Sequence, residues 1–272
     1  MKFDGILFCT DLDGTLFNSQ RIVSKENKDA IEYFKAEGGR FTFITGRPPV
    51  ISREVYEAVE PNAPIGCFNG GGIYDFTTEQ LLWSVTLPKE ADELVAVIDR
   101  EVPEVGFQYN YSKGIYFCKE NGAMERFREF TGAANVFMPY TEIAEPIIKV
   151  VFGDMNVENI EKTECLLRGH EKAATFDFIR SEETLFEILP KGVSKGALLL
   201  KLAEILNIEP SKTIAVGDYN NDISMVKAAG VGYAVENAVP ELKAVADRVT
   251  ISNDGHAIAK IVDELDRGII KL

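Results

Sequence analysis

The chain has 272 residues, of which 46% are hydrophobic and 26% charged. This balance is typical of a soluble globular protein, and the length allows one large or two modest domains. Acidic residues number 43 and basic residues 29, which gives a net charge of -14 at pH 7. Such a surface repels nucleic acid and anionic membranes, so neither is expected as a partner. An anionic substrate would need a local positive centre, such as a metal ion, a lysine or a helix N-terminus.

The cysteines and the N-terminus predict a cytoplasmic protein. No two cysteines form a Cys-x-x-Cys pair, which predicts free thiols in a reducing compartment. No long apolar stretch precedes Asp11, and no apolar run reaches the length of a membrane span. The four cysteines are Cys9, Cys67, Cys118 and Cys165.

Strands and amphipathic helices alternate over the first part of the chain. The expected elements are a strand over 6–10, a helix over 24–37, a strand over 41–44, a helix over 50–59 and a strand over 65–68. Alternation of this kind predicts right-handed crossovers and a mainly parallel sheet.

The character of the sequence changes near Leu82, after which the patterns predict antiparallel hairpins. The expected elements are a helix over 89–100, a hairpin of 107–111 with 115–117, a strand over 147–152, a helix over 157–167 and a hairpin of 175–179 with 185–189. We interpret residues 84–189 as a separate α+β module inserted into the first domain. Most aromatic residues lie in or near this insert, which suits either a substrate cover or the core of its own sheet.

The alternating pattern returns after Pro190. Ser194 is placed to cap the helix that follows it. The expected elements are helices over 194–206, 223–229, 240–246 and 256–265, with strands over 213–216, 232–235 and 248–251.

Two carboxylates, Asp11 and Asp13, directly follow the apolar run 6–10. They should lie at the carboxyl end of a strand, where open α/β sheets bind their ligands. Carboxylates this close repel each other unless one is protonated or a cation lies between them, and Mg2+ is the usual cation where phosphate is also bound. A calcium loop is excluded because its glycine and glutamate positions fall on Leu16 and Ile22. For this motif alone, an acidic turn without a chemical role stays an alternative.

A second acidic cluster, residues 217–222, follows the strand predicted over 213–216. Parallel strands present their carboxyl ends at one edge of the sheet, so Asp218 and Asp222 can converge with Asp11 on a hard cation. An Asx turn that caps the next helix is the structural alternative.

Two further positions point to an anion. Thr45, Gly46 and Arg47 follow a strand and precede a helix, where a hydroxyl and free backbone amides bind phosphate oxygens; an ordinary cap is the alternative. Lys195 lies in the first helical turn after Ser194, where the helix dipole disfavours a cation unless an anion is near. A phosphoryl group or the aspartate cluster would be such an anion, and an exposed lysine is the alternative.

In chain order, Asp-x-Asp-Gly-Thr, Thr-Gly-Arg, an isolated lysine and Gly-Asp-x-x-Asn-Asp resemble the four motifs of the haloacid dehalogenase superfamily of phosphohydrolases. The position of the insert, between the Thr and Lys motifs, resembles the Cof-like branch of that superfamily. The resemblance implies an α/β fold with a Rossmann-like, mainly parallel sheet and helices on both faces. Residues 1–83 and 190–272 would form this catalytic core, and 84–189 an α+β cap.

The resemblance also implies roles for individual residues. Asp11 would attack phosphorus to form an aspartyl-phosphate, and Asp13 would protonate the leaving alkoxide and later activate water. The implied substrate-binding residues are Leu12, Thr45, Gly46, Arg47, Lys195 and Asn221, of which Thr45 and Lys195 hold phosphoryl oxygens and Asn221 orients Lys195 or the phosphate. The implied Mg2+ ligands are Asp11, the backbone carbonyl of Asp13, Asp218 and Asp222.

The resulting hypothesis is a Mg2+-dependent phosphatase of small phosphomonoesters, foremost sugar phosphates, that works as a monomer or homodimer. A phosphotransferase or mutase of the same fold would pass the phosphoryl group to a sugar hydroxyl instead of water. A non-catalytic phospho-accepting receiver is the third candidate, and the length of the insert argues against it. In the cap, Tyr109, Tyr111, Lys113, Arg180 and Glu187 are expected to be surface or core residues.

Overall fold

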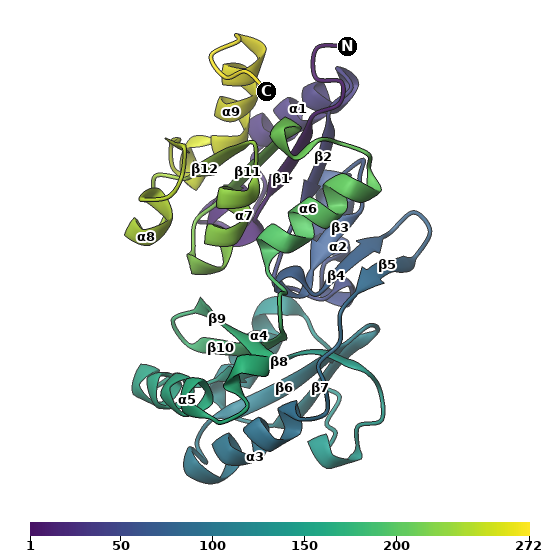
Figure 1. Cartoon of the computed structure of the whole chain (residues 1–272). Coiled ribbons are helices and arrows are strands. Elements are labelled where there is room, and N and C mark those ends of the chain that lie inside the picture. Colours follow the sequence, from purple (N-terminus) through teal and green to yellow (C-terminus); the bar gives the residue numbers. More distant parts are fainter. The chain divides into compact units, whose positions relative to one another are not determined.

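The computed structural model describes residues 1–272, and the chain divides into two compact units (Figure 1). Unit 1 comprises Met1–Thr45, Glu54–Leu82 and Ser194–Leu272, and unit 2 comprises Gly46–Arg53 and Trp83–Val193. The short segment Gly46–Arg53 therefore belongs with the middle of the chain. No helix combines the length and the apolar character that crossing a membrane requires.

Unit 1 contains a parallel sheet of five strands in the order β13-β12-β11-β1-β2. Thr10 at the end of β1 lies opposite Val216 on one neighbour and Phe43 on the other. The three neighbouring strands β11, β1 and β2 thus end together, and the residues that follow them share one edge of the sheet. The strands are β1 (Leu7–Thr10), β2 (Arg40–Phe43), β11 (Thr213–Gly217), β12 (Val231–Ala234) and β13 (Arg248–Val249).

Helices cover both faces of this sheet. Phe8 of β1 packs edge-on against Phe34, so one face carries α1. Ile44, which follows Phe43, alternates to the other face. A Cβ on the nearby Gly66 would lie 2.9 Å from Ile44 and 2.5 Å from Leu198 of α6, so α6 covers that face. The predicted α/β fold with a mainly parallel sheet is confirmed. The helices are α1 (Lys25–Ala36), α2 (Arg53–Val59), α6 (Lys195–Ile205), α7 (Ile223–Ala228), α8 (Pro240–Lys243) and α9 (Ala257–Asp266).

Strand β3 (Ile65–Cys67) begins a small three-stranded sheet that the sequence analysis missed. It continues through β4 (Gly72–Asp75) and β5 (Gln80–Ser84). The carboxylate of Asp75 accepts hydrogen bonds from the backbone and the hydroxyl of Thr77, which builds the turn after β4. The apolar run of β5, Leu81 to Trp83, is short, and none of the residues of β5 is fully buried.

Unit 2 is built on an antiparallel sheet in the order β7-β6-β8-β10-β9. The two predicted hairpins and the strand between them are confirmed. One face packs on α3 (Ala91–Glu101) and α5 (Val157–Gly169), and the other on α4 (Gly122–Thr131). The strands are β6 (Gly106–Tyr111), β7 (Gly114–Lys119), β8 (Ile147–Gly153), β9 (Phe176–Glu182) and β10 (Leu185–Pro190).

Two of the predicted helices have different bounds in the structure, and one helix of the structure was not predicted. The helix expected over 50–59 is a 3-10 turn at Pro49–Ile51 followed by α2, and the helix expected over 240–246 ends at Lys243. Helix α4 was not predicted, although Met124, Phe127 and Phe130 recur along it at helical spacing. It is started by Asn121, whose side chain accepts hydrogen bonds from two backbone amides.

Candidate active site

Lys195 joins two of the strand-end carboxylates in unit 1. Its Nζ donates to Oδ1 of Asp11 and to Oδ1 of Asp222, both at 2.6 Å. The lysine is completely buried, which excludes the exposed side chain considered as an alternative. Burial alone lowers the pKa of Lys195, but the charges of Asp11 and Asp222 outweigh it and raise the pKa above its ordinary value. The ammonium therefore stays charged and fixes both carboxylates.

The loop after β11 holds the other predicted acidic residues. Oδ2 of Asp222 accepts hydrogen bonds from the backbone N–H groups of Asp218 and Tyr219, at 3.0 and 3.1 Å. Oδ1 of Asp218 accepts one from the hydroxyl of Thr15 at 3.0 Å. Asp222 thus has both oxygens engaged, and Thr15 joins the site although it was not among the predicted residues.

Carboxylate oxygens of Asp11, Asp218 and Asp222 lie within 4.8 Å of one another. Burial and the neighbouring carboxylates raise the pKa of Asp11 to about 7 and that of Asp218 to about 8. Two like charges held this close in a dry site are unfavourable, and a divalent cation removes the conflict. The donor set, all carboxylate oxygen, suits a hard cation such as Mg2+.

A glycine lets the two acidic segments approach each other. Gly14 has a φ of +75°, and a Cβ at this position would lie 2.3 Å from Oδ2 of Asp218. A side chain here would be strained and would also displace that carboxylate. The glycine of the Asp-x-Asp-Gly motif is thus required both by its backbone conformation and by contact with a residue more than two hundred positions away.

Thr45 and Asn221 are linked through Asn69, a residue that the sequence analysis did not select. The backbone N–H of Asn69 donates to the carbonyl of Thr45, and Nδ2 of Asn221 donates to Oδ1 of Asn69, both at 3.1 Å. Nδ2 of Asn69 and Oδ1 of Asn221 are buried without a partner, so the network has one donor and one acceptor to spare. The sequence feature that could have indicated Asn69 is its place as a polar residue directly after the strand predicted over 65–68.

The remaining predicted residues lie in different surroundings. Asp13 is about half exposed, 3.7 Å from Arg21. Leu12 is fully buried in the core of unit 1. Gly46 and Arg47 belong to unit 2, where the guanidinium of Arg47 lies 5.9 Å from the ring centre of Phe130. Their assignment to the substrate site stays a prediction.

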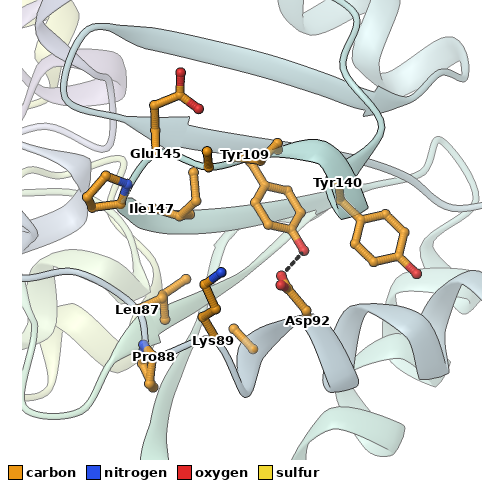
Figure 2. Close-up of a pocket in the computed structure, with 12 residues that line it drawn as sticks. Leu87, Pro88, Lys89, Asp92, Tyr109, Tyr140, Glu145 and Ile147 are labelled. Atoms are coloured by element: carbon orange, nitrogen blue, oxygen red, sulfur yellow. Dashed lines mark hydrogen bonds between the residues drawn. The ribbon is translucent and has the colours of Figure 1, made fainter.

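Unit 2 has a separate hollow of about 170 Å³ between the start of α3, β6 and residues 140–147 (Figure 2). The hydroxyl of Tyr109 donates to Asp92 at 2.8 Å, and burial together with that carboxylate raises the pKa of Tyr109. None of the predicted site residues lines this hollow. Tyr109 is a core residue, as expected from the sequence.

Fold and site together define an α/β enzyme that gathers three carboxylates and a buried lysine where parallel strands end. Residues 8–262 match the family model of haloacid dehalogenase-like hydrolases. The chain belongs to this family, as its motifs indicated.

Curated relatives of the full length are phosphatases. YwtE of Bacillus subtilis, a 5-amino-6-(5-phospho-D-ribitylamino)uracil phosphatase, is 30% identical, and the alignment covers 95% of this chain and 97% of the relative. Phosphatase YwpJ of the same organism is also 30% identical, with coverage of 95% and 99%. The chain is therefore a phosphatase of the haloacid dehalogenase-like family.

Solved structures agree with this fold along the whole chain. A haloacid dehalogenase-like hydrolase from Bacteroides thetaiotaomicron superposes with a TM-score of 0.84 at 25% identity, covering 96% of this chain and 99% of that chain. One from B. subtilis gives 0.83 at 28% identity, with coverage of 95% and 99%.

Proposed function

We propose that this protein is a Mg2+-dependent phosphomonoester hydrolase that acts on sugar phosphates or similar small phosphometabolites through an aspartyl-phosphate on Asp11. The observation that carries the proposal is the contact of the Lys195 ammonium with Asp11 and Asp222 at 2.6 Å. This contact supports a site for phosphoryl transfer, in which Asp11 is the nucleophile and Lys195 supplies positive charge. The carboxylates of Asp11, Asp218 and Asp222 would bind a hard cation beside them.

Asp11 is the nucleophile. One of its carboxylate oxygens attacks phosphorus, and the bond between phosphorus and the leaving oxygen breaks as the new bond forms. Lys195 favours the ionised, nucleophilic form of Asp11 despite its burial, because the ammonium lies against Oδ1. The same ammonium offsets the charge that builds on the phosphoryl oxygens during transfer.

Asp13 is the general acid and base. It gives a proton to the leaving alkoxide in the first half-reaction and takes one from the attacking water in the second. Water then displaces Asp11 from phosphorus, which releases inorganic phosphate and restores the free carboxylate. Asp13 is only half-buried, which suits a group that exchanges protons with water and leaving group alike.

Mg2+ would be held by Asp11, Asp218, Asp222 and the backbone carbonyl of Asp13, and when bound it supplies positive charge to the phosphoryl oxygens. Thr45 and Lys195 hold further phosphoryl oxygens. The unpaired Nδ2 of Asn69 is a candidate donor to the same group. Leu12, Gly46, Arg47 and Asn221 complete the proposed substrate site.

Unit 2, which contains the predicted insert 84–189, is proposed to act as the substrate-specificity cap. The core contacts only what all phosphomonoesters share, so selection among leaving groups falls to this unit. The name of the relative YwtE includes a phosphorylated ribityl chain, which supports a polyhydroxylated leaving group. Free cysteines and a small phosphorylated substrate support a cytoplasmic location.

A phosphate-release screen over sugar phosphates, nucleotides and cofactor phosphates tests the proposal. Release is expected with Mg2+, is lost with chelator and is lost in the Asp11→Asn variant. Failure to release phosphate from any ester in the presence of Mg2+ would overturn it.

A further inference from the structure

The sheet of unit 2 carries a row of buried polar side chains on one face. Gln108 of β6 and Glu187 of β10 both lie opposite Val151 of β8, and Asn110 lies opposite Lys149. Directly opposite residues of an antiparallel sheet share a face, and so do residues two apart on one strand. The four residues Gln108, Asn110, Lys149 and Glu187, here called the polar row, therefore lie side by side.

The polar row is buried but incompletely hydrogen-bonded. All four side chains are at most 3% exposed. Nζ of Lys149 donates to Oε2 of Glu187 at 2.8 Å, while both polar atoms of the Gln108 amide and both of the Asn110 amide have no partner. Unpaired buried amides destabilise a folded protein, so two of them, two residues apart on β6, are most simply explained by a ligand that pairs with them.

The same sheet face is the one reached by the segment that follows Thr45. Ile51, from the segment Gly46–Arg53, packs against the cluster that contains Val151 and Phe117. Phe117 lies directly opposite Gln108. The opposite face, which carries Tyr109 and Val150, belongs to the separate core beneath α3 and α5. The polar row therefore lies on the same sheet face as Ile51, which is six positions after Thr45 in the sequence.

We infer that the polar row binds the hydroxyl groups of the substrate's leaving group and thereby selects polyhydroxylated phosphate esters. Each amide has a donor and an acceptor, and a hydroxyl group can pair with both. The ammonium of Lys149 and the carboxylate of Glu187 can form further hydrogen bonds beyond the one that joins them. All four side chains are buried, so a ligand reaches them only when the packing over this sheet face opens. This inference rests on the proposed function.

The experiment compares polyhydroxylated phosphate esters with an alkyl ester that has no hydroxyl groups. The probes are ribitol 5-phosphate, with ribose 5-phosphate and glucose 6-phosphate beside it, against n-pentyl phosphate, and the readout is the ratio of kcat/KM values with Mg2+. The wild-type ratio is expected to favour at least one polyhydroxylated ester by about tenfold or more, because a site built for hydroxyls rejects the analogue that lacks them. A protein that releases phosphate from none of these esters, nor from any in the wider screen, overturns the proposed function itself.

Gln108→Met removes the amide and keeps the shape. It is expected to reduce the ratio by about tenfold or more, with a Tm equal to or above that of the wild type, because an unpaired amide is replaced by an apolar group. A purely structural glutamine would move the Tm and leave the ratio alone. Asn110→Leu is the second variant and should act in the same direction.

Tyr109→Phe is the matched control, since it changes the neighbouring residue on the opposite face of the same strand and is expected to leave the ratio unchanged. The inference is overturned if the wild type hydrolyses n-pentyl phosphate as well as the hydroxylated esters. It is equally overturned if the row variants keep the wild-type ratio or if Tyr109→Phe lowers it as much as they do.

Discussion

Nζ of Lys195 lies 2.6 Å from Oδ1 of Asp11, although the two residues are 184 positions apart in the sequence. The lysine is fully buried, so its charge depends on Asp11 and on the second partner, Asp222. Removing one member of such a set leaves the other charges buried and unpaired. Loss of one partner is therefore expected to destabilise the fold as well as to disturb the proposed chemistry.

Lys195→Met is expected to lower the free energy of unfolding of the metal-free protein by about 3–5 kcal/mol, because it leaves buried carboxylates uncompensated. Urea denaturation measures the change. Lys201→Met is the control: this lysine lies on the same helix in a partly exposed pair with Glu204, and its loss should cost less than about 1 kcal/mol. Equal effects of the two substitutions would contradict the role assigned to Lys195.

Asp11→Asn should abolish phosphate release while preserving the fold. An amide is a far weaker nucleophile than a carboxylate, so kcat is expected to fall by about a thousandfold or more. Circular dichroism and the Tm establish that the variant is folded. Retention of more than about a tenth of wild-type kcat would contradict nucleophilic attack by Asp11.

Asp13→Asn should slow both halves of the reaction for esters with a poor leaving group, but only the second half for p-nitrophenyl phosphate. Attack by Asp11 needs no proton from Asp13 when the leaving group is a good one such as p-nitrophenolate, whereas hydrolysis of the phosphoenzyme needs a base. A burst of p-nitrophenolate stoichiometric with enzyme, followed by slow turnover, is expected in rapid-quench experiments. A variant that turns over p-nitrophenyl phosphate without a burst and at the wild-type rate would rule out this role.

The stability of the metal-free protein should fall as the pH rises. The folded-state pKa values of Asp11 and Asp218, about 7 and about 8, lie above the ordinary value of 3.8. The stability that these groups contribute is therefore fully present below about pH 4 and is lost as the pH rises through about 7 to 8. The Tm in chelator is expected to decrease between about pH 5 and about pH 8.

Added Mg2+ should raise the Tm far more at about pH 8 than at about pH 5, where protons compete for the same carboxylates. Differential scanning fluorimetry with chelator or Mg2+ measures both effects. Asp11→Asn is the control, and its metal-free Tm should depend less steeply on pH. A wild-type Tm in chelator that rises over this interval would refute the assignment.

Gly14→Ala should weaken Mg2+ binding by about tenfold, because the added Cβ would displace the Asp218 carboxylate. Gly5→Ala is a matched control, since Gly5 has the same φ of +75° but no atom within 4 Å of the added Cβ. Both variants carry the backbone strain, and only Gly14→Ala carries the contact. The Mg2+ concentration that half-saturates the Tm shift compares them, and equal shifts would show that the contact is unimportant.

The strand ends that carry Asp11 and Asp218 were predictable because they depend on local rules. The apolar runs that precede Asp11 and Asp218 indicate buried strands. Parallel strands have their carboxyl ends at one edge of the sheet. Ser194 accepts a hydrogen bond from the backbone of Ala197, as predicted for a helix cap. The missed elements β5 and α4 bury few of their side chains.

The sequence by itself determined the order of strands and helices, the ends of the central strands and the family, because these depend on apolar periodicity, caps and motifs within short stretches of chain. Only the tertiary structure decided which side chains meet: Lys195 between Asp11 and Asp222, Asn69 with Asn221, and the polar row on one face of the second sheet. These contacts join segments far apart in the sequence, and they depend on strand register and close approach through space, which periodicity within a segment does not encode.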